Sequence, residues 1–316
     1  MTRLSVIICT HNPLADYLRR VLEALAVQTL PLTQWELLLI DNASDSALAP
    51  RCDLSWHPRA RMVREDTLGL TPARLRGIRE SDGDILVYVD DDNVLEPNYL
   101  QTALGLLTEH VFLGAVGAGA LEPEFAVEPG PDLTPYLGSL ALRSNPKASW
   151  SHDPTDTACV PWGAGLAVRR AVAQAYVQLV ARLDAHGLLD RRGQRLYGNG
   201  DVAFSWAASL IGKGFGVFPD LRATHLIRAE RVTRQYFLRL ACDSALSGSV
   251  SDYLFLGIAP SSKTRRWLEL IRLPLRGIRR GRFAMQMGWA CIRGTDQARQ
   301  LIKLKRLKPL AMERPR

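Results

Sequence analysis

Three consecutive carboxylates, Asp90, Asp91 and Asp92, directly follow the apolar run Ile85–Val89. Adjacent carboxylates repel one another and resist loss of water, so burying them without a cation would cost several kcal/mol per group. A divalent cation removes this cost, and oxygen ligands favour Mg²⁺ or Mn²⁺ over zinc. In an extended segment Asp90 and Asp92 would point one way and Asp91 the other. The simpler alternative is a solvated acidic turn that caps the next helix.

The elements that position this triplet alternate between strand and helix patterns, which predicts a parallel sheet with crossover helices. Strands are expected at 4–9, 36–40 and 85–89, with helices that begin at Asn12-Pro13 and at Thr71-Pro72. Ligands of open α/β sheets bind outside the carboxyl ends of the strands. Asp41 and the triplet follow two such ends, so we expect them to face one crevice.

The rest of the chain is less regular. A helix near 97–107 and a strand near 111–116 precede the segment 123–161, which holds seven of the eighteen prolines. A loop of this length usually serves as a lid or binds a partner. Beyond it the patterns predict a strand at 165–168, a helix at 170–184, a helix from about 201, and strands at 215–218 and 223–227.

Composition limits the class of protein. With 316 residues, 47% of them hydrophobic and 23% charged, the chain is typical of a globular protein. Its five scattered cysteines favour neither a disulfide framework nor a zinc site. The apolar start is too short for a secretory signal, and no apolar run reaches the roughly 18 residues of a membrane span. We therefore expect a cytoplasmic protein.

Charge is distributed unevenly. Residues 263–316 hold sixteen Lys and Arg against three acids, a net charge of +13, whereas residues 1–262 have a net charge of −5. Basic stretches with aromatic residues lie at anionic membrane surfaces. A helical subdomain that packs on the rest of the protein is the other interpretation of this tail. Pro274, Gly277 and Gly281 predict short helical pieces rather than one continuous helix.

Four sequence blocks together resemble family 2 glycosyltransferases. They are Ser5–Asn12, Leu39–Ser44, Gly69–Gly77 and Tyr88–Asn93 with Pro97, in the family's order and spacing, and the likeness extends less sharply to about residue 247. The resemblance implies the GT-A fold, an α/β, Rossmann-like, mostly parallel sheet flanked by helices, here with a basic helical C-terminal extension. We expect a glycosyltransferase domain at 1–250, with a nucleotide-binding half at 1–120 and an acceptor half at 121–250, followed by the extension at 251–316.

The resemblance also implies a nucleotide-diphosphate sugar donor. Thr10, Asn12 and Asp41 would lie near its base and ribose, Asp90 and Asp91 would contact the donor, and Asp92 would hold Mn²⁺ or Mg²⁺ on the diphosphate. Arg74 matches the family's basic residue, whose guanidinium can bind phosphate oxygens. Leu75 stands where the family usually has Asn. The alternative for Arg74 is a surface arginine on a helix.

Gly198–Phe204 is similar to the family's Glu-Asp block, although Gly200 replaces the Glu. Asp201 is the remaining carboxylate, so it is the candidate base that deprotonates the acceptor hydroxyl in an inverting displacement. It could also cap the helix that begins there.

Two further assignments follow from the resemblance. His225 matches the family histidine that approaches the metal or the diphosphate, with a structural histidine as the alternative. Trp162 and Gly163 match the segment that lines the sugar, with a core tryptophan as the alternative.

The sequence thus predicts a metal-dependent, inverting, hexosyltransferase-type enzyme of glycan, polysaccharide or glycolipid biosynthesis, with a saccharide or lipid-linked acceptor. It lacks the Gln-x-x-Arg-Trp motif of the processive synthases, which favours single additions. Peripheral contact with the cytoplasmic membrane face through the basic tail is a secondary prediction.

Three other functions are weaker. A catalytically silent sugar-nucleotide or glycan-binding module is favoured only by the departures at Leu75 and Gly200. A sugar nucleotidyltransferase would need a glycine-rich, basic loop where Thr10–Pro13 stands. Nucleic-acid binding is not expected, because the acidic body offers no continuous basic track.

Overall fold

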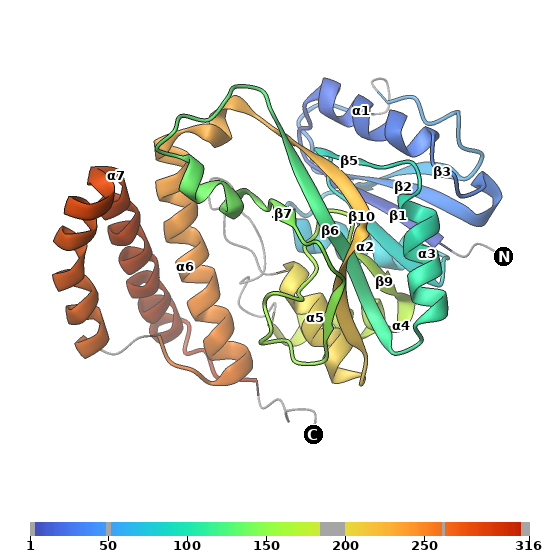
Figure 1. Ribbon diagram of the computed structural model, residues 1–316. Helices are drawn as coiled ribbons and strands as arrows, with labels where there is room; N and C mark the ends of the chain where they lie inside the picture. Colours follow the sequence, from blue (N-terminus) through green and yellow to red (C-terminus); the bar gives the residue numbers. More distant parts are fainter. Residues whose placement is uncertain (1–3, 49–51, 184–199, 261–262, 311–316) are drawn as a thin grey trace. The chain divides into compact units, whose positions relative to one another are not determined.

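The computed structural model of the 316-residue chain describes residues 4–48, 52–183, 200–260 and 263–310 (Figure 1). The described chain divides into two compact units. The first lies within Met1–Glu124, Ala141–Ala185 and Gly200–Ile227, and the second within Phe125–Leu140 and Arg228–Arg316. Each unit has its own packing and is described separately.

The first unit is built on a central sheet flanked by helices, as the sequence predicts. Its first four strands run parallel in the order β3-β2-β1-β4, with bounds Leu4–Thr10 for β1, Trp35–Asn42 for β2, Ala60–Glu65 for β3 and Ile85–Val89 for β4. Helix α1 (Ala15–Ala26) connects β1 to β2, and α2 (Leu70–Glu80) connects β3 to β4. These crossovers return each strand in the same direction, so four carboxyl ends meet at one edge.

The second half of the sheet mixes short and long strands in antiparallel pairs. Strand β9 (Ala167–Arg169) pairs with β4 on one side and with β6 (Leu113–Phe125) on the other. Strand β10 (Gly214–Ile227) pairs with β5 (Asn93–Leu95) and β8 (Ser149–Ser151), and β7 (Arg143–Ser144) pairs with β6. The prediction of two strands at 215–218 and 223–227 is wrong, because one strand continues through Pro219.

Period-two alternation assigns side chains to the two faces of the parallel strands. Val6 and Ile8 pack with apolar residues of α1 and of α3 (Tyr99–Glu109). Ile7 faces the other way, and a Cβ on Gly77 of α2 would lie 2.6 Å from its Cγ2. On that second face α4 (Arg170–Leu183) and α5 (Gly200–Leu210) stack Tyr176 on Phe204 at 3.8 Å between ring centroids. Both faces of the strands are therefore buried.

The second unit is helical. Helix α6 (Arg234–Leu256) begins at Thr233, whose hydroxyl accepts a hydrogen bond from the Tyr236 amide. It packs with α7 (Lys263–Leu304) and with the short helix η3 (Thr134–Leu140), whose Tyr136 contacts the rings of Phe237 and Phe283. Gly281, at φ 85° and ψ 167°, divides α7 into two helices. The tail is helical in two long pieces rather than the several short ones predicted, and Pro274 lies inside the first.

Candidate active site

The carboxyl ends of β1, β2 and β4 form the edge at which the predicted residues gather. Strand β1 lies between the other two, with Thr10 opposite Asp41 and Ile8 opposite Val89. The Thr10 hydroxyl donates a hydrogen bond to the Asp91 carboxylate. The register therefore brings Asp41 and the acidic triplet to one edge of the sheet, and the crevice between them stays a prediction.

The acidic triplet lies in a turn beyond the strand. Strand β4 ends at Val89, and the Asn93 amide donates to the Asp90 carbonyl at 3.1 Å. The strand alternation used to pair Asp90 with Asp92 is therefore wrong. The helix-capping alternative is wrong too, because β5 follows the turn and α3 begins only at Tyr99, with Asn98 as its cap residue.

The three carboxylates face three different partners. Asp91 accepts from Thr10, and an Asp92 oxygen lies 3.4 Å from Nε2 of His225. His225 reaches this position because β10 pairs with β5, which sets His225 opposite Asn93. An Asp90 oxygen lies 3.9 Å from the place that a Cβ on Gly163 would take. Each of the three acids therefore lies beside a different neighbour.

Asp41 is held by two neighbours. Its Oδ2 accepts from Nη1 of Arg64 at 2.8 Å, and its Oδ1 accepts from the Ser44 amide at 3.2 Å. Burial opposes its charge, but the hydrogen bonds from Ser44 and Arg64 outweigh this and hold the pKa of Asp41 below its usual value. Asp41 is thus a carboxylate fixed in position and charge.

The first helix does not begin at Asn12-Pro13 as predicted. Helix α1 begins at Ala15 after Leu14, whereas Asn12 adopts φ 49° and its Nδ2 donates to Asp45 at 2.8 Å. Its backbone amide donates to the Ser44 hydroxyl at 3.0 Å. Asn and Asp tolerate this left-handed conformation better than most residues. Asn12 therefore joins the loop after β1 to the loop after β2, beside the site.

Arg74 is buried beneath the site, so the surface alternative is wrong. It is 4% exposed, and its guanidinium carbon lies 5.8 Å from the Tyr88 ring centroid and 5.9 Å from that of Phe204. Burial opposes its charge, but the electrostatic attraction of Tyr176, Asp201 and Asp90 raises the pKa of Arg74 above its usual value. A buried cation thus interacts electrostatically with two acids of the site, Asp201 and Asp90.

Two glycines leave room for this guanidinium. A Cβ on Gly163 would lie 2.7 Å from Nη2 of Arg74, and a Cβ on Gly200 would lie 2.5 Å from Nη1. Gly200 stands where the resembling family has Glu. In this chain the guanidinium occupies the space that such a side chain would enter.

Asp201 lies in the first turn of α5, where a negative charge suits the helix dipole. Its Oδ2 accepts from the Gly163 amide at 3.2 Å, and its Oδ1 accepts from the Val202 amide at the same distance. The side chain therefore contacts the 162–165 segment as well as its own helix. Because α5 already begins at Gly200, Asp201 lies within the helix and the alternative that it caps the helix is wrong; its catalytic role stays a prediction.

Arg143, on β7, contacts a predicted site residue although no sequence pattern marks it. Its guanidinium carbon lies 3.8 Å from the Trp162 ring centroid, and Nη2 donates to the Val160 carbonyl at 3.0 Å. Burial lowers the pKa of Arg143 to about 10, although Cys159 and Asp201 act in the opposite direction. Trp162 also packs against the hydrophobic core, so one of its faces already has a cationic neighbour. Arg143 lies in the proline-rich segment, where no pattern marks it.

Cys9 lies near the end of β1 and interacts electrostatically with two acids of the triplet. Burial raises the pKa of its thiol to about 12, and Asp90 and Asp91 add to this rise while Arg74 opposes it. The thiol is therefore neutral at physiological pH and is no nucleophile.

Comparison with known proteins agrees with this architecture. Glycosyl transferase family 2 matches residues 5–137. The uncharacterized glycosyltransferase YwdF of Bacillus subtilis is 27% identical over 99 residues, which are 31% of this chain and 36% of that protein. Glycosyltransferase AglE of Haloferax volcanii is 27% identical over 107 residues, 33% of this chain and 35% of that protein. The matched region spans about a third of either relative.

Among solved structures, the mannosyltransferase PcManGT from Pyrobaculum calidifontis, in complex with GDP-Man and Mn²⁺, is similar over 94% of this chain and 86% of that one. The TM-score is 0.54 at 19% sequence identity, which is a likeness of fold. Residues 5–137 thus match the model of Glycosyl transferase family 2, and the chain has the GT-A fold that its sequence predicts.

Proposed function

We propose that the chain is a metal-dependent, inverting glycosyltransferase that moves a sugar from a nucleotide-diphosphate donor to an acceptor hydroxyl. The observation that carries the proposal is the meeting of Thr10, Asp41 and the Asp90–Asp92 turn at one sheet edge. The family match of residues 5–137 supports the reaction class. The GDP-Man complex of the PcManGT neighbour supports a nucleotide-diphosphate sugar as donor.

A divalent metal fits the residues present. The described residues contain no group of three His, Cys, Asp or Glu side chains arranged to hold a metal. Mg²⁺ and similar ions bound to nucleotides need fewer, because they use one or two protein ligands together with phosphate oxygens and water. Asp92 and His225, 3.4 Å apart, supply such a pair. When bound there, Mn²⁺ or Mg²⁺ neutralises charge on the departing diphosphate.

The remaining residues divide the other tasks. Asp41, fixed by Arg64 and Ser44, and Thr10 bind the nucleoside, and Asp90 and Asp91 contact the donor. Asp201 accepts the proton of the acceptor hydroxyl as it attacks the anomeric carbon. Its hydrogen bond from the Gly163 amide aims the carboxylate at the segment proposed to line the sugar.

Arg74 acts from below rather than on the open face of the site. Because it is buried among acids, we assign it the part of holding Asp90 and Asp201 in place, with its donor contact made through them. This refines the phosphate contact expected from sequence.

Turnover with a panel of UDP-, GDP- and TDP-sugars tests the proposal. Release of the nucleotide should require Mn²⁺ or Mg²⁺ and stop on chelation. Asp201→Asn should lower turnover about 10²- to 10⁴-fold while donor binding persists. Near-normal turnover by a folded Asp201→Asn variant, or activity that survives chelation, would contradict the assignment.

A silent sugar-nucleotide-binding module is the second candidate. It is favoured by Gly200, which leaves Asp201 as the one carboxylate of the Glu-Asp block. Calorimetry that detects donor binding, with neither transfer nor donor hydrolysis in any acceptor mixture, would favour the module.

The acceptor and the setting belong to the same proposal. We expect a saccharide or lipid-linked acceptor in glycan, polysaccharide or glycolipid biosynthesis, and peripheral contact with the cytoplasmic membrane face. The basic segment from residue 263 supports that contact. In the described part of the chain, no helix combines the length and apolar character that a membrane span needs.

A further inference from the structure

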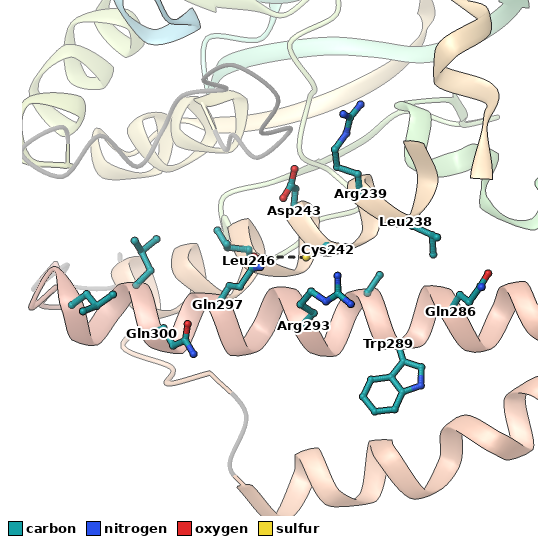
Figure 2. Close-up of a pocket in the computed structure, with 13 residues that line it drawn as sticks. Leu238, Arg239, Cys242, Asp243, Leu246, Gln286, Trp289, Arg293, Gln297 and Gln300 are labelled. Carbon is teal, nitrogen blue, oxygen red and sulfur yellow. Dashed lines mark hydrogen bonds between the residues drawn. The ribbon is translucent and has the colours of Figure 1, made fainter. Parts of the chain in front are cut away.

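A groove of about 740 Å³ runs along the seam between α6 and the second half of α7 (Figure 2). Leucines supply its apolar lining, with Leu238 and Leu246 on α6 and Leu301 and Leu304 on α7. Arg239 on α6 and Arg293 on α7 supply cationic groups. The groove therefore combines an apolar lining with guanidinium groups from both helices.

The helix pair that forms the groove is closely packed. Gly294 lies against the Cys242 backbone so tightly that a Cβ there would overlap the carbonyl. The Cys242 thiol donates to Gln297 across the seam at 3.7 Å. The chain beyond α7 is fixed to α6 as well, because the Leu310 amide donates to the Leu254 carbonyl at 2.7 Å. The groove is thus a shaped feature of a fixed pair rather than a gap between loose helices.

The rim of the groove exposes apolar side chains to water. Trp289 is 48% exposed and Leu304 is 82% exposed, and Figure 2 shows Trp289 pointing away from α6. A tryptophan combines an apolar body with an N–H donor, which suits the headgroup layer of a membrane. Exposed aliphatic side chains gain free energy in lipid but gain nothing from a polar nucleic-acid backbone.

The net charge of the segment that contains α7 indicates which kind of surface the groove would bind. Residues 263–316 have a net charge of +13, against −5 for the rest of the chain, while Asp243 is the one acid that lines the groove among the described residues. A basic segment of this kind is attracted to anionic lipids at close range. A groove that combines leucines with arginines can contact both the apolar and the anionic parts of a membrane surface.

We propose that this groove docks the protein on an anionic phospholipid surface, with Arg239 and Arg293 binding lipid phosphates and Trp289 entering the headgroup layer. The inference rests on the membrane contact of the proposed function and adds the surface and the lipid class. Its chemistry is independent of the donor site, so the two are tested separately.

The test is co-sedimentation of the full chain with phosphatidylcholine vesicles, with and without 30 mol% phosphatidylglycerol (about 0.15 M salt). The wild-type protein should bind the anionic vesicles only. Arg239→Gln with Arg293→Gln should weaken binding about 25-fold, at about fivefold per charge. The control, Arg59→Gln with Arg79→Gln, removes two exposed charges from the first unit and should change binding little.

Tryptophan quenching by brominated lipid locates the contact. Trp289→Phe should remove much of the quenching, whereas Trp150→Phe, at a tryptophan that is 50% exposed in the first unit, should leave it unchanged. Equal vesicle binding by both double variants would overturn the proposal. So would displacement of the vesicles by poly(U) RNA, or self-association detected by light scattering in place of vesicle binding.

Donor binding measured by calorimetry on the same variants separates the two proposals. Loss of vesicle binding with donor affinity retained supports the groove. If the wild-type protein binds no donor but the arginine variants still lose vesicle binding, the membrane-docking proposal is supported and the proposed transferase function is overturned.

Discussion

Gly200→Ala is the sharpest test of how the site is held together. The added Cβ would lie 2.5 Å from Nη1 of Arg74, and ordinary contact begins near 3.4 Å, so the guanidinium must retreat by about 0.9 Å. It has little room, because Arg74 is buried and the rings of Tyr88 and Phe204 lie within 6 Å of its guanidinium carbon.

Displacement of the Arg74 guanidinium should affect catalysis by changing its electrostatic interactions and the positions of the carboxylates near it. Arg74 interacts electrostatically with Asp201 and Asp90, and a misplacement of about 1 Å can cost on the order of 10²-fold in rate. We expect kcat to fall about 10- to 100-fold with the donor already bound. Strain in the packed site should also lower the free energy of unfolding by about 1–3 kcal/mol.

The assay is nucleotide release at saturating donor, together with urea unfolding. Gly105→Ala is the matched control, because Gly105 lies within α3 and a Cβ there meets nothing within 4 Å. It should stabilise the protein by up to about 1 kcal/mol and leave kcat unchanged. In an Arg74→Met background, Gly200→Ala should cost little, since the clash is gone. Wild-type kcat and stability in the single Gly200→Ala variant would refute the reasoning.

Three further predictions concern the metal pair, the fixed carboxylate and the sheet. Asp92→Asn and His225→Ala should each weaken Mn²⁺ binding in the presence of UDP by tenfold or more, measured by calorimetry; unchanged Mn²⁺ affinity would remove them as ligands. Because the folded pKa of Asp41 is depressed, its stabilisation is present above about pH 4 and is lost as pH falls through the folded pKa. Arg64→Met should therefore lower Tm more at pH 7 than at a pH low enough to protonate Asp41 in the folded protein, and an equal shift under both conditions would contradict this. Gly83→Ala should destabilise by about 3 kcal/mol in urea unfolding, because its Cβ would lie 2.7 Å from the rigid backbone of β1; a wild-type midpoint would show that the strand can yield.

The sequence predicts the parallel core well because its signals are local. Fully buried strands such as β2 and β4 are continuous apolar runs, and the acids and amides that end them mark the carboxyl edge. Because the carboxyl ends of parallel strands meet at one edge of a sheet, the same local pattern predicts that Asp41 and the acidic triplet lie together there.

The features that the sequence missed depend on contacts between distant residues. Strand β3 reads Ala-Arg-Met-Val-Arg-Glu, whose half-exposed pattern at the sheet edge carries no strong strand signal. Arg143 stacks on Trp162, nineteen positions later, and local sequence patterns do not predict such a contact. The burial of Arg74 is equally hard to predict from sequence. Helical spacing puts it on the inner face of α2, but a charged side chain is usually expected at the surface.

The buried arginine also bears on whether the chain is an enzyme or a silent module. A site that only binds a donor needs its nucleoside and phosphate contacts, but it gains nothing from a buried cation that interacts electrostatically with Asp90 and Asp201. Such a cation costs stability unless its neighbours are charged and fixed, and local rules are usually broken in this way at functional sites. Gly200, which first suggests a lost catalytic acid, is then the residue that lets Arg74 lie beside the remaining one. If so, Gly200→Ala must act on kcat rather than on donor affinity, and an effect confined to donor affinity would favour the module.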